Sequence, residues 1–223
     1  MNKCLLGGGY RLMIMSLGLW VMLVGCQAAP IILPQVDESV IFEEQFIVGQ
    51  TGPWLLETDN LGQTAVVDNA MLIRVNEPYT VQYSTLSDPS FDDFILDVDV
   101  MQLSGSLESS YGVLFRVQDT RHFYRFSITS KGFYVVERHT ELAGWERLTG
   151  GWESNPNINR GLRVLNKLRI AATGNLMLFS VNGKLLTQID DPSFNEGQIA
   201  LSAGTFAEGD LEVTFDNVVV RKP

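Results

Sequence analysis

Hydrophobic and polar residues alternate with a period of two over much of the chain, which is the pattern of β-strands with one buried face. From Val40 onward no stretch of about ten residues has the apolar spacing of a helix, whereas alternating segments recur roughly every eight to twelve residues. The predicted strands are residues 41–48, 64–67, 70–75, 79–84, 93–103, 111–118, 122–130, 133–139, 145–149, 162–172, 175–181, 184–190, 197–203 and 211–220. Many short strands at even spacing predict an all-β protein, with two antiparallel sheets packed as a sandwich or jelly roll.

Three turns between these strands carry the residues that tight hairpins need. Lys131-Gly132 separates two aromatic-rich segments, and Thr173-Gly174-Asn175 separates two others. Asn182-Gly183 is the pair favoured in a type I′ turn, because both residues tolerate a positive φ. The sequence therefore predicts an antiparallel hairpin at each of the three turns.

The alternation also assigns side chains to faces. In strand 93–103, Asp97 and Asp99 lie opposite the apolar residues, so we expect both to face solvent on an outer sheet surface. Strands 111–118 and 122–130 carry apolar or aromatic groups on both faces. We expect them at the centre of a sheet, with one face lining a groove.

The N-terminal residues have a different pattern. Residues 1–11 carry two positive charges, and residues 12–24 form an uncharged apolar run that is short for a transmembrane helix, which needs about 20 residues. The run ends in Leu23-Val24-Gly25-Cys26, which resembles the lipobox of bacterial lipoproteins. The alternative is an uncleaved anchor helix with a coincidental cysteine.

The lipobox resemblance implies a signal peptide at residues 1–25, removed before Cys26, which would carry a lipid anchor. The protein would then be extracytoplasmic and bound to the membrane through this lipid, at the outer membrane in a cell that has one. Residues 26–40 contain two prolines and no hydrophobic period, which predicts a short tether between the lipid anchor and the domain. The predicted β-sandwich domain occupies residues 41–223.

Composition narrows the function classes. The net charge is −10, and because the leader holds two basic residues and no acid, the remainder carries −12. Nucleic acid is therefore not an expected partner, since phosphate binding needs clustered basic residues. Cys4 and Cys26 are the only cysteines, so the predicted body can form no disulfide, cysteine-based zinc site or cysteine nucleophile. The oligomeric state stays open.

Several short motifs follow one another between residues 41 and 221. They are Phe42-Glu43-Glu44-Gln45-Phe46 with Trp54 downstream, Tyr111-Gly112-Val113-Leu114-Phe115-Arg116, Phe123-Tyr124-Arg125-Phe126-Ser127-Ile128, Gly132-Phe133-Tyr134, Asn166-Lys167-Leu168-Arg169-Ile170, Val181-Asn182-Gly183 and Phe215-Asp216-Asn217-Val218. Their order resembles concanavalin A-like lectin and glucanase domains, in particular the bacterial branch that contains the 3-keto-disaccharide hydrolase domain. The resemblance implies a jelly roll with a concave face, which in many relatives meets carbohydrate.

No catalytic residue is assigned. Glucanases of this fold carry a Glu-x-Asp-x-Glu type of strand, whereas the nearest sequence here, Asp97-Val98-Asp99-Val100-Met101, lacks both glutamates. Neither a Gly-x-Ser-x-Gly elbow nor a glycine-rich phosphate loop is present.

No metal site or cofactor is assigned either. His122 and His139 lie at strand ends without a cysteine or a carboxylate cluster nearby in sequence. Asp92-Asp93, Asp97 with Asp99, and Asp190-Asp191 could supply oxygen ligands to a structural calcium ion, but no run matches a defined calcium loop.

Two arginines and three aromatic residues are the candidate ligand-binding groups. Arg116 and Arg125 lie in the central strands and could donate to sugar hydroxyls or to a carboxylate; the alternative is an ion pair with Asp216 or Glu137. Tyr124, Trp145 and Trp152 could stack against a sugar or could cover the core.

Three functions follow as hypotheses. The first is a surface-anchored, non-catalytic module that binds glycan. The second is a glycoside-cleaving enzyme of the 3-keto-disaccharide hydrolase type. The third is a structural or adhesive module that contacts other proteins.

Overall fold

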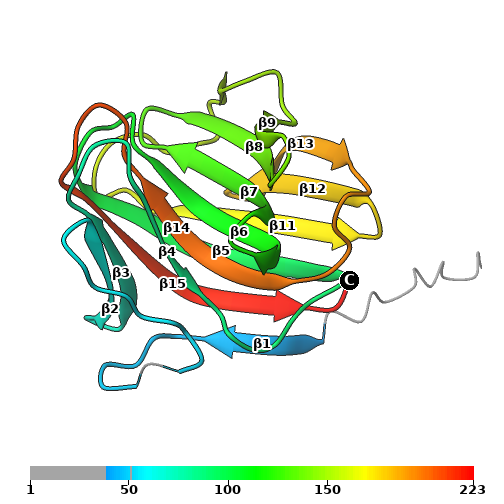
Figure 1. Ribbon diagram of the computed structural model, residues 1–223, viewed down its shortest axis with the longest axis horizontal. Helices are drawn as coiled ribbons and strands as arrows, with labels where there is room; N and C mark the ends of the chain where they lie inside the picture. Colours follow the sequence, from blue (N-terminus) through cyan, green and yellow to red (C-terminus); the bar gives the residue numbers. More distant parts are fainter. Residues whose placement is uncertain (1–38, 51) are drawn as a thin grey trace, which may run out of the picture. The chain divides into compact units, whose positions relative to one another are not determined.

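The computed structural model describes residues 39–50 and 52–223 (Figure 1). The predicted signal peptide, Cys26 and nearly all of the predicted tether lie outside these residues. The described part contains fifteen β-strands and no helix, as the alternating pattern predicts. Within residues 39–50 and 52–223, no helix is long and apolar enough to cross a membrane.

The strands form two antiparallel sheets. The eight-stranded sheet runs in the order β13 (Lys184–Asp190), β12 (Leu176–Val181), β11 (Asn166–Thr173), β5 (Phe94–Ser104), β15 (Leu211–Arg221), β3 (Ala70–Val75) and β2 (Gly62–Val67), and β1 (Val40–Glu44) also pairs with β15. The seven-stranded sheet runs in the order β10 (Glu153–Ser154), β8 (Phe133–Thr140), β7 (His122–Thr129), β6 (Ser110–Asp119), β14 (Gln198–Gly204) and β4 (Val81–Thr85), and β9 (Gly144–Arg147) also pairs with β8.

The core lies between the two sheets and is rich in aromatic rings. Phe126 of β7 and Phe179 of β12 come from opposite sheets, and their ring centroids are 5.1 Å apart. Phe115 of β6 stacks on Tyr124 of β7 with centroids 5.3 Å apart. Burial of each such ring stabilises the fold by about 2 kcal/mol, and the contact between Phe126 and Phe179 joins the two sheets.

The two-sheet jelly-roll prediction is confirmed, and the predicted strands agree with the observed ones to within a few residues except at 41–48 and 162–172. The three predicted hairpins are present, joining β7 to β8, β11 to β12 and β12 to β13. Asn182 and Gly183 have φ values of +51° and +76°, which is the sign pattern of a type I′ turn. The two-residue strand β10 has no pattern by which it could be predicted.

Asp97 lies on the outer face of the eight-stranded sheet, as alternation predicts, but it does not face solvent. The guanidinium group of Arg169 donates to both of its carboxylate oxygens, at 2.8 and 2.7 Å, and Arg221 donates at 2.8 Å. The two arginine side chains leave Asp97 only 4% exposed. The expectation of exposure is wrong because long side chains from neighbouring strands cover the shorter aspartate.

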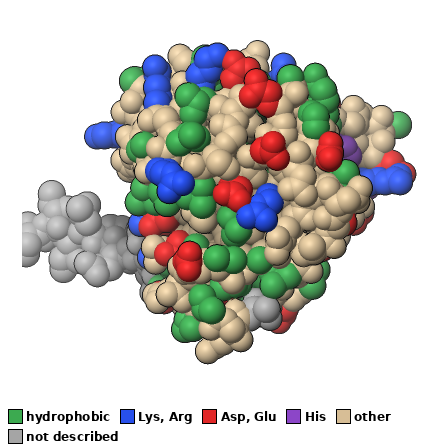
Figure 2. Space-filling view, turned by 90° about the vertical axis from the view of Figure 1, so that its left-hand side faces the viewer, with side chains coloured by type: hydrophobic (Ala, Val, Ile, Leu, Met, Phe, Trp, Pro, Cys, Tyr) green, Lys and Arg blue, Asp and Glu red, His purple; other side chains and the backbone are tan. Residues whose placement is uncertain are grey.

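Acidic and basic side chains are interspersed on the side of the molecule seen in Figure 2. Some opposite charges are cross-strand partners; for example, Arg74 of β3 pairs with Glu212 of β15 at 2.6 Å. Such exposed pairs contribute little stability, typically below about 1 kcal/mol.

Candidate functional site

Strand register arranges the outer face of the seven-stranded sheet in transverse rows. Near one end, Phe123, His139 and Trp145 lie opposite one another on β7, β8 and β9. In the next row, Arg125 on β7 pairs across to Glu137 on β8. These side chains share a face because successive residues of a strand alternate between its two sides.

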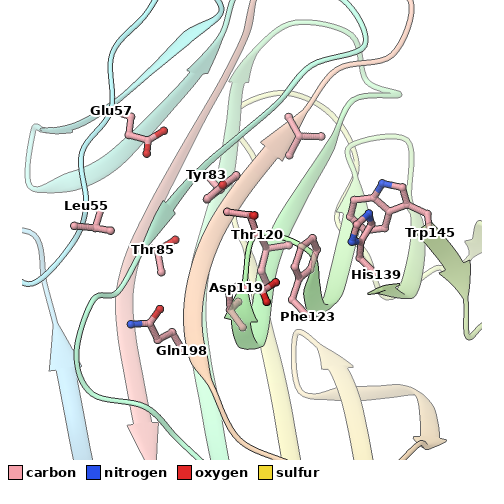
Figure 3. A pocket seen from close by; sticks show the side chains of 13 residues that line it. Leu55, Glu57, Tyr83, Thr85, Asp119, Thr120, Phe123, His139, Trp145 and Gln198 are labelled. Atoms are coloured by element: carbon pink, nitrogen blue, oxygen red, sulfur yellow. The ribbon is translucent and has the colours of Figure 1, made fainter. Parts of the chain in front are cut away.

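An open cavity of about 390 Å³ lies over these rows (Figure 3). Trp145 and His139 stand on one side of it, and Leu55 and Glu57 of the β1–β2 connection stand on the other. The remaining lining residues are Val81, Tyr83, Thr85, Leu114, Val117, Asp119, Thr120, Phe123 and Gln198. The volume falls in the range of small-ligand sites, and a mainly apolar wall with a few polar groups is typical of them.

Two rings, those of Phe123 and His139, fix the position of Trp145. Phe123 and His139 stack almost in parallel, with centroids 5.2 Å apart and planes inclined by 9°. Trp145 meets His139 edge-on at 4.8 Å and Phe123 at 5.5 Å. The indole nevertheless remains 45% exposed at the cavity. It therefore offers a preorganised aromatic surface to a ligand.

An ion-pair network lies directly behind the indole. The guanidinium carbon of Arg125 is 4.0 Å from the Trp145 ring centroid, a cation–π contact. The same guanidinium binds Glu137 Oε2 through Nε, at 2.9 Å, and through Nη2. Arg147 approaches the other oxygen of Glu137 with Nε at 3.7 Å. The ion pair with Glu137 was the alternative left open for Arg125, and the structure contains it.

Two polar residues at the cavity have their orientations fixed by hydrogen bonds. Asp119 accepts the backbone N–H of Arg121 at 2.7 Å and lies 2.9 Å from His122 Nδ1, and these contacts lower the pKa of its carboxyl group. His139 Nδ1 lies 2.7 Å from the Arg121 carbonyl oxygen. Because a carbonyl can only accept, Nδ1 must carry the proton, which leaves Nε2 of the neutral ring as an acceptor.

A second cavity, also of about 390 Å³, lies on the same face of the sheet. Trp152 of the β9–β10 connection contacts Phe206 of the β14–β15 connection there, with ring centroids 6.2 Å apart. The other lining residues are Glu108, Thr129, Lys131, Phe133 and Arg147. The two tryptophans that are close in sequence therefore serve different cavities.

Arg116 does not reach this face. Its backbone has a φ of +50°, and the pairing of β6 shifts register around it. The side chain consequently turns inward, is fully buried, and donates to the carbonyl oxygens of Phe194, at 2.9 Å, and Asp92, at 3.3 Å. Val117 lines the outer cavity in its place. Strict alternation along β6 would place Arg116 on the outer face with Leu114, and the irregularity around it turns the side chain inward instead.

Tyr124 is also buried in the sandwich. Its hydroxyl group donates to Asp191 Oδ1 at 2.6 Å, and burial raises the pKa of the phenol to about 12. It packs on Phe115 and Phe194 rather than facing either cavity. Of the two alternatives left open for this ring, the structure shows a core position.

A family model for the 3-keto-alpha-glucoside-1,2-lyase-like domain matches residues 48–221. The chain belongs to this family. No curated protein matches the lyase-like domain significantly. The matched segment covers every strand from β2 to β15, and so includes both cavities.

Solved structures share the fold of the lyase-like domain at low sequence identity. A carbohydrate-binding module, CBM66 from Bacillus subtilis, is 17% identical over 77% of this chain and 96% of its own, with a TM-score of 0.62. A non-specific endo-β-1,3(4)-glucanase of family GH16 is 10% identical over 83% of this chain and 91% of its own, with a TM-score of 0.60. A Bacillus subtilis protein with a galectin-like fold is 10% identical over 84% and 97%, with a TM-score of 0.64. The jelly roll of carbohydrate-binding and glycoside-hydrolase domains is thus established.

Sequence patterns did not indicate several residues that line the first cavity in the lyase-like domain. Leu55 and Glu57 come from a connection with no local signal, and Asp119 and Gln198 lie at strand ends that meet only through the sheet order. Within residues 39–50 and 52–223, no group of three or more His, Cys, Asp or Glu side chains is placed to hold a metal ion. The Asp93 carboxylate accepts the backbone N–H of Gly174 at 2.7 Å.

Proposed function

We propose that the cavity beside Trp145 binds carbohydrate. The observation that carries the proposal is the half-exposed indole, held by Phe123, His139 and Arg125 at the mouth of an open cavity. A sugar ring presents an apolar face of C–H groups, which fits against an aromatic surface that is already in place.

The polar groups around the cavity complement sugar hydroxyls. Asp119 and Glu57 can accept hydrogen bonds, and the Gln198 amide can both accept and donate. A carbohydrate-binding module and a glucanase with the same jelly roll support this choice of ligand class. The proposal does not require catalysis.

Replacement of Trp145 tests the proposal. Isothermal titration of the full chain, in a detergent without a sugar headgroup, against a panel of envelope and plant oligosaccharides should find at least one ligand. Trp145→Ala should lower the affinity for that ligand at least about tenfold, because stacking of a ligand ring on an aromatic side chain contributes about 1 to 3 kcal/mol. Leu142→Ala is the matched control, since Leu142 is 99% exposed and lies outside the cavity wall.

Two results would contradict carbohydrate binding at this site. One is the absence of any binding at millimolar sugar by protein whose far-ultraviolet circular dichroism shows an intact β fold. The other is an unchanged affinity in Trp145→Ala. A crystal structure in which the protein's own side chains fill this cavity would instead favour the structural or adhesive alternative.

Cleavage of a 3-keto-glycoside in the same cavity is the second candidate, and the family match favours it. The imidazole of His139 and the carboxylates of Asp119 and Glu57 are the groups that could move a proton there. Incubation with a 3-keto-disaccharide, followed by mass spectrometry, should then show two products. His139→Gln should slow the formation of both. If the disaccharide stays intact after prolonged incubation, cleavage is contradicted and carbohydrate binding is the function that remains.

We also propose that a lipid on Cys26 holds the protein at the membrane, outside the cytoplasm. The lipobox resemblance supports this, and the acidic, cysteine-free body fits an exported module. In a bacterial host, metabolic labelling with a fatty acid should mark the wild-type chain and leave Cys26→Ala unlabelled. A labelled Cys26→Ala chain would contradict the assignment.

A further inference from the structure

The two cavities on the seven-stranded sheet lie along one line. Phe123, which lines the first cavity, and Thr129, which lines the second, are six residues apart on the same face of β7. At about 3.3 Å per residue these two wall residues are about 20 Å apart. A single sugar unit cannot reach both, whereas an oligosaccharide can.

One short segment forms the rim of both cavities. Trp145 belongs to the first, and Arg147 and Trp152 belong to the second. Trp145 and Arg147 are both exposed, because they are two residues apart on β9 and so point to the same side. A ligand that leaves the indole along β9 therefore meets the guanidinium group of Arg147 next.

The two cavities differ in charge. The first has the carboxylates of Glu57 and Asp119 and no lysine or arginine in its wall. The second has Arg147 and Lys131 against a single acid, Glu108. Lys131 and Glu108 pair with each other at the surface, so the unmatched charge of this cavity is the guanidinium of Arg147.

Arg147 is only loosely held by the protein. Its side chain is 58% exposed, and its nearest carboxylate oxygen, on Glu137, is 3.7 Å away, beyond normal hydrogen-bond distance. Glu137 is already bound through its other oxygen by Arg125. The planar donors of Arg147 are therefore available to a carboxylate, which a guanidinium can bind through two parallel hydrogen bonds.

We propose that the second cavity is a subsite for the carboxylate of an acidic sugar unit, bound by Arg147 beside Trp152. The neutral units of the same oligosaccharide lie against Trp145. The inference rests on the proposed function, since it assigns one ligand class to the cavity beside Trp145 and the second cavity taken together. Lys131 adds to the positive field of the subsite.

A matched pair of ligands tests the subsite. The probes are a tetrasaccharide with a terminal glucuronic acid and its carboxyl-reduced counterpart, which carries glucose at that position. Isothermal titration should show the acidic probe binding the full chain at least about tenfold more tightly, with a preference that shrinks as salt is added. Arg147→Gln should abolish the preference, because it should weaken the acidic probe at least about tenfold more than the reduced probe.

Two further variants separate the subsite from the proposed function. Arg74→Gln, an exposed arginine of β3 in the other sheet, should keep the preference for the acidic probe. Trp145→Ala should weaken both probes by a similar factor. Equal affinities of the wild-type chain for the two probes, or a preference that survives Arg147→Gln, would overturn the subsite while leaving carbohydrate binding intact. Failure of both probes to bind would overturn both.

Discussion

Arg116 and Arg125 lie on adjacent strands of one sheet, and their backbones send them to opposite sides of it. Arg125 follows regular alternation and reaches the outer face, where it supports Trp145. Arg116 has a positive φ and turns into the sandwich, where its guanidinium satisfies two backbone carbonyl groups and lies 3.8 Å from Asp93. One is therefore part of the site, and the other holds the loops that surround the core.

Arg116→Ala should lower the free energy of unfolding by about 3 kcal/mol, because it removes the donors to one buried and one partly buried carbonyl group and opens a cavity. Urea titration followed by tryptophan fluorescence measures the change. Arg121→Ala should change it by less than about 0.5 kcal/mol, since Arg121 forms an exposed ion pair with Glu141. Equal effects of the two substitutions would show that the interior contacts of Arg116 contribute nothing specific.

Among the elements, the β12–β13 hairpin shows how a turn can serve more than its own two strands. Asn182 accepts the backbone N–H of Lys167 at 2.9 Å, and its amide nitrogen donates to the carbonyl of Asn157 at 2.8 Å and to Asn166 Oδ1 at 2.9 Å. The residue thus combines the positive φ of the turn with three bonds to neighbouring segments. Both properties contribute to stability, and substitution can separate them.

Asn182→Gly should retain the backbone conformation and lose the side-chain bonds, lowering the free energy of unfolding by about 1 to 2 kcal/mol. Asn182→Ala should cost about 1 kcal/mol more, because alanine disfavours a positive φ. Paired urea titrations of the two variants measure both quantities. Equal free energies of unfolding for Asn182→Ala and Asn182→Gly would contradict the cost assigned to the positive φ at this position.

The same elements show what the sequence can and cannot predict. Alternation and turn residues are local, so strands and hairpins such as β7–β8 were predictable from residues 122–139 alone. The site was predictable only in part: Trp145, Trp152 and Arg125 lie at or beside the cavities, whereas Glu57 enters through sheet order, which alternation does not encode. Regular alternation would also place Arg116 on the outer face, whereas its positive φ turns the side chain inward, and no local sequence pattern indicates that φ.

At the scale of the whole molecule, ion pairs join neighbouring strands on the outer face of the eight-stranded sheet. Asp97 on the central strand β5 joins Arg169 of β11 to Arg221 of β15, and so links three neighbouring strands. Burial acts to raise the pKa of Asp97, but hydrogen bonds and positive charge from the arginines outweigh it, and the pKa lies below its ordinary value. The folded state therefore favours the ionised carboxylate.

This shift predicts how stability depends on pH. Since the pKa is lower in the folded chain, the contribution of Asp97 is complete above the ordinary aspartate pKa of about 4, and it is lost as the pH falls through the folded value. Asp97→Asn should destabilise the protein by about 2 kcal/mol at pH 7. Urea midpoints measured from pH 7 to pH 2 should converge for the two proteins at the acidic end. Parallel curves would contradict the assignment.

The position of β15 has a consequence for the order in which the chain can fold. This strand is formed by residues 211–221, yet it lies between β5 and β3 and also pairs with β1, at the other end of the described sequence (Figure 1). The eight-stranded sheet therefore cannot close around its core until residues 211–221 have left the ribosome. Synthesis of β15, rather than of the hairpins that precede it, sets the earliest moment at which the sandwich can form.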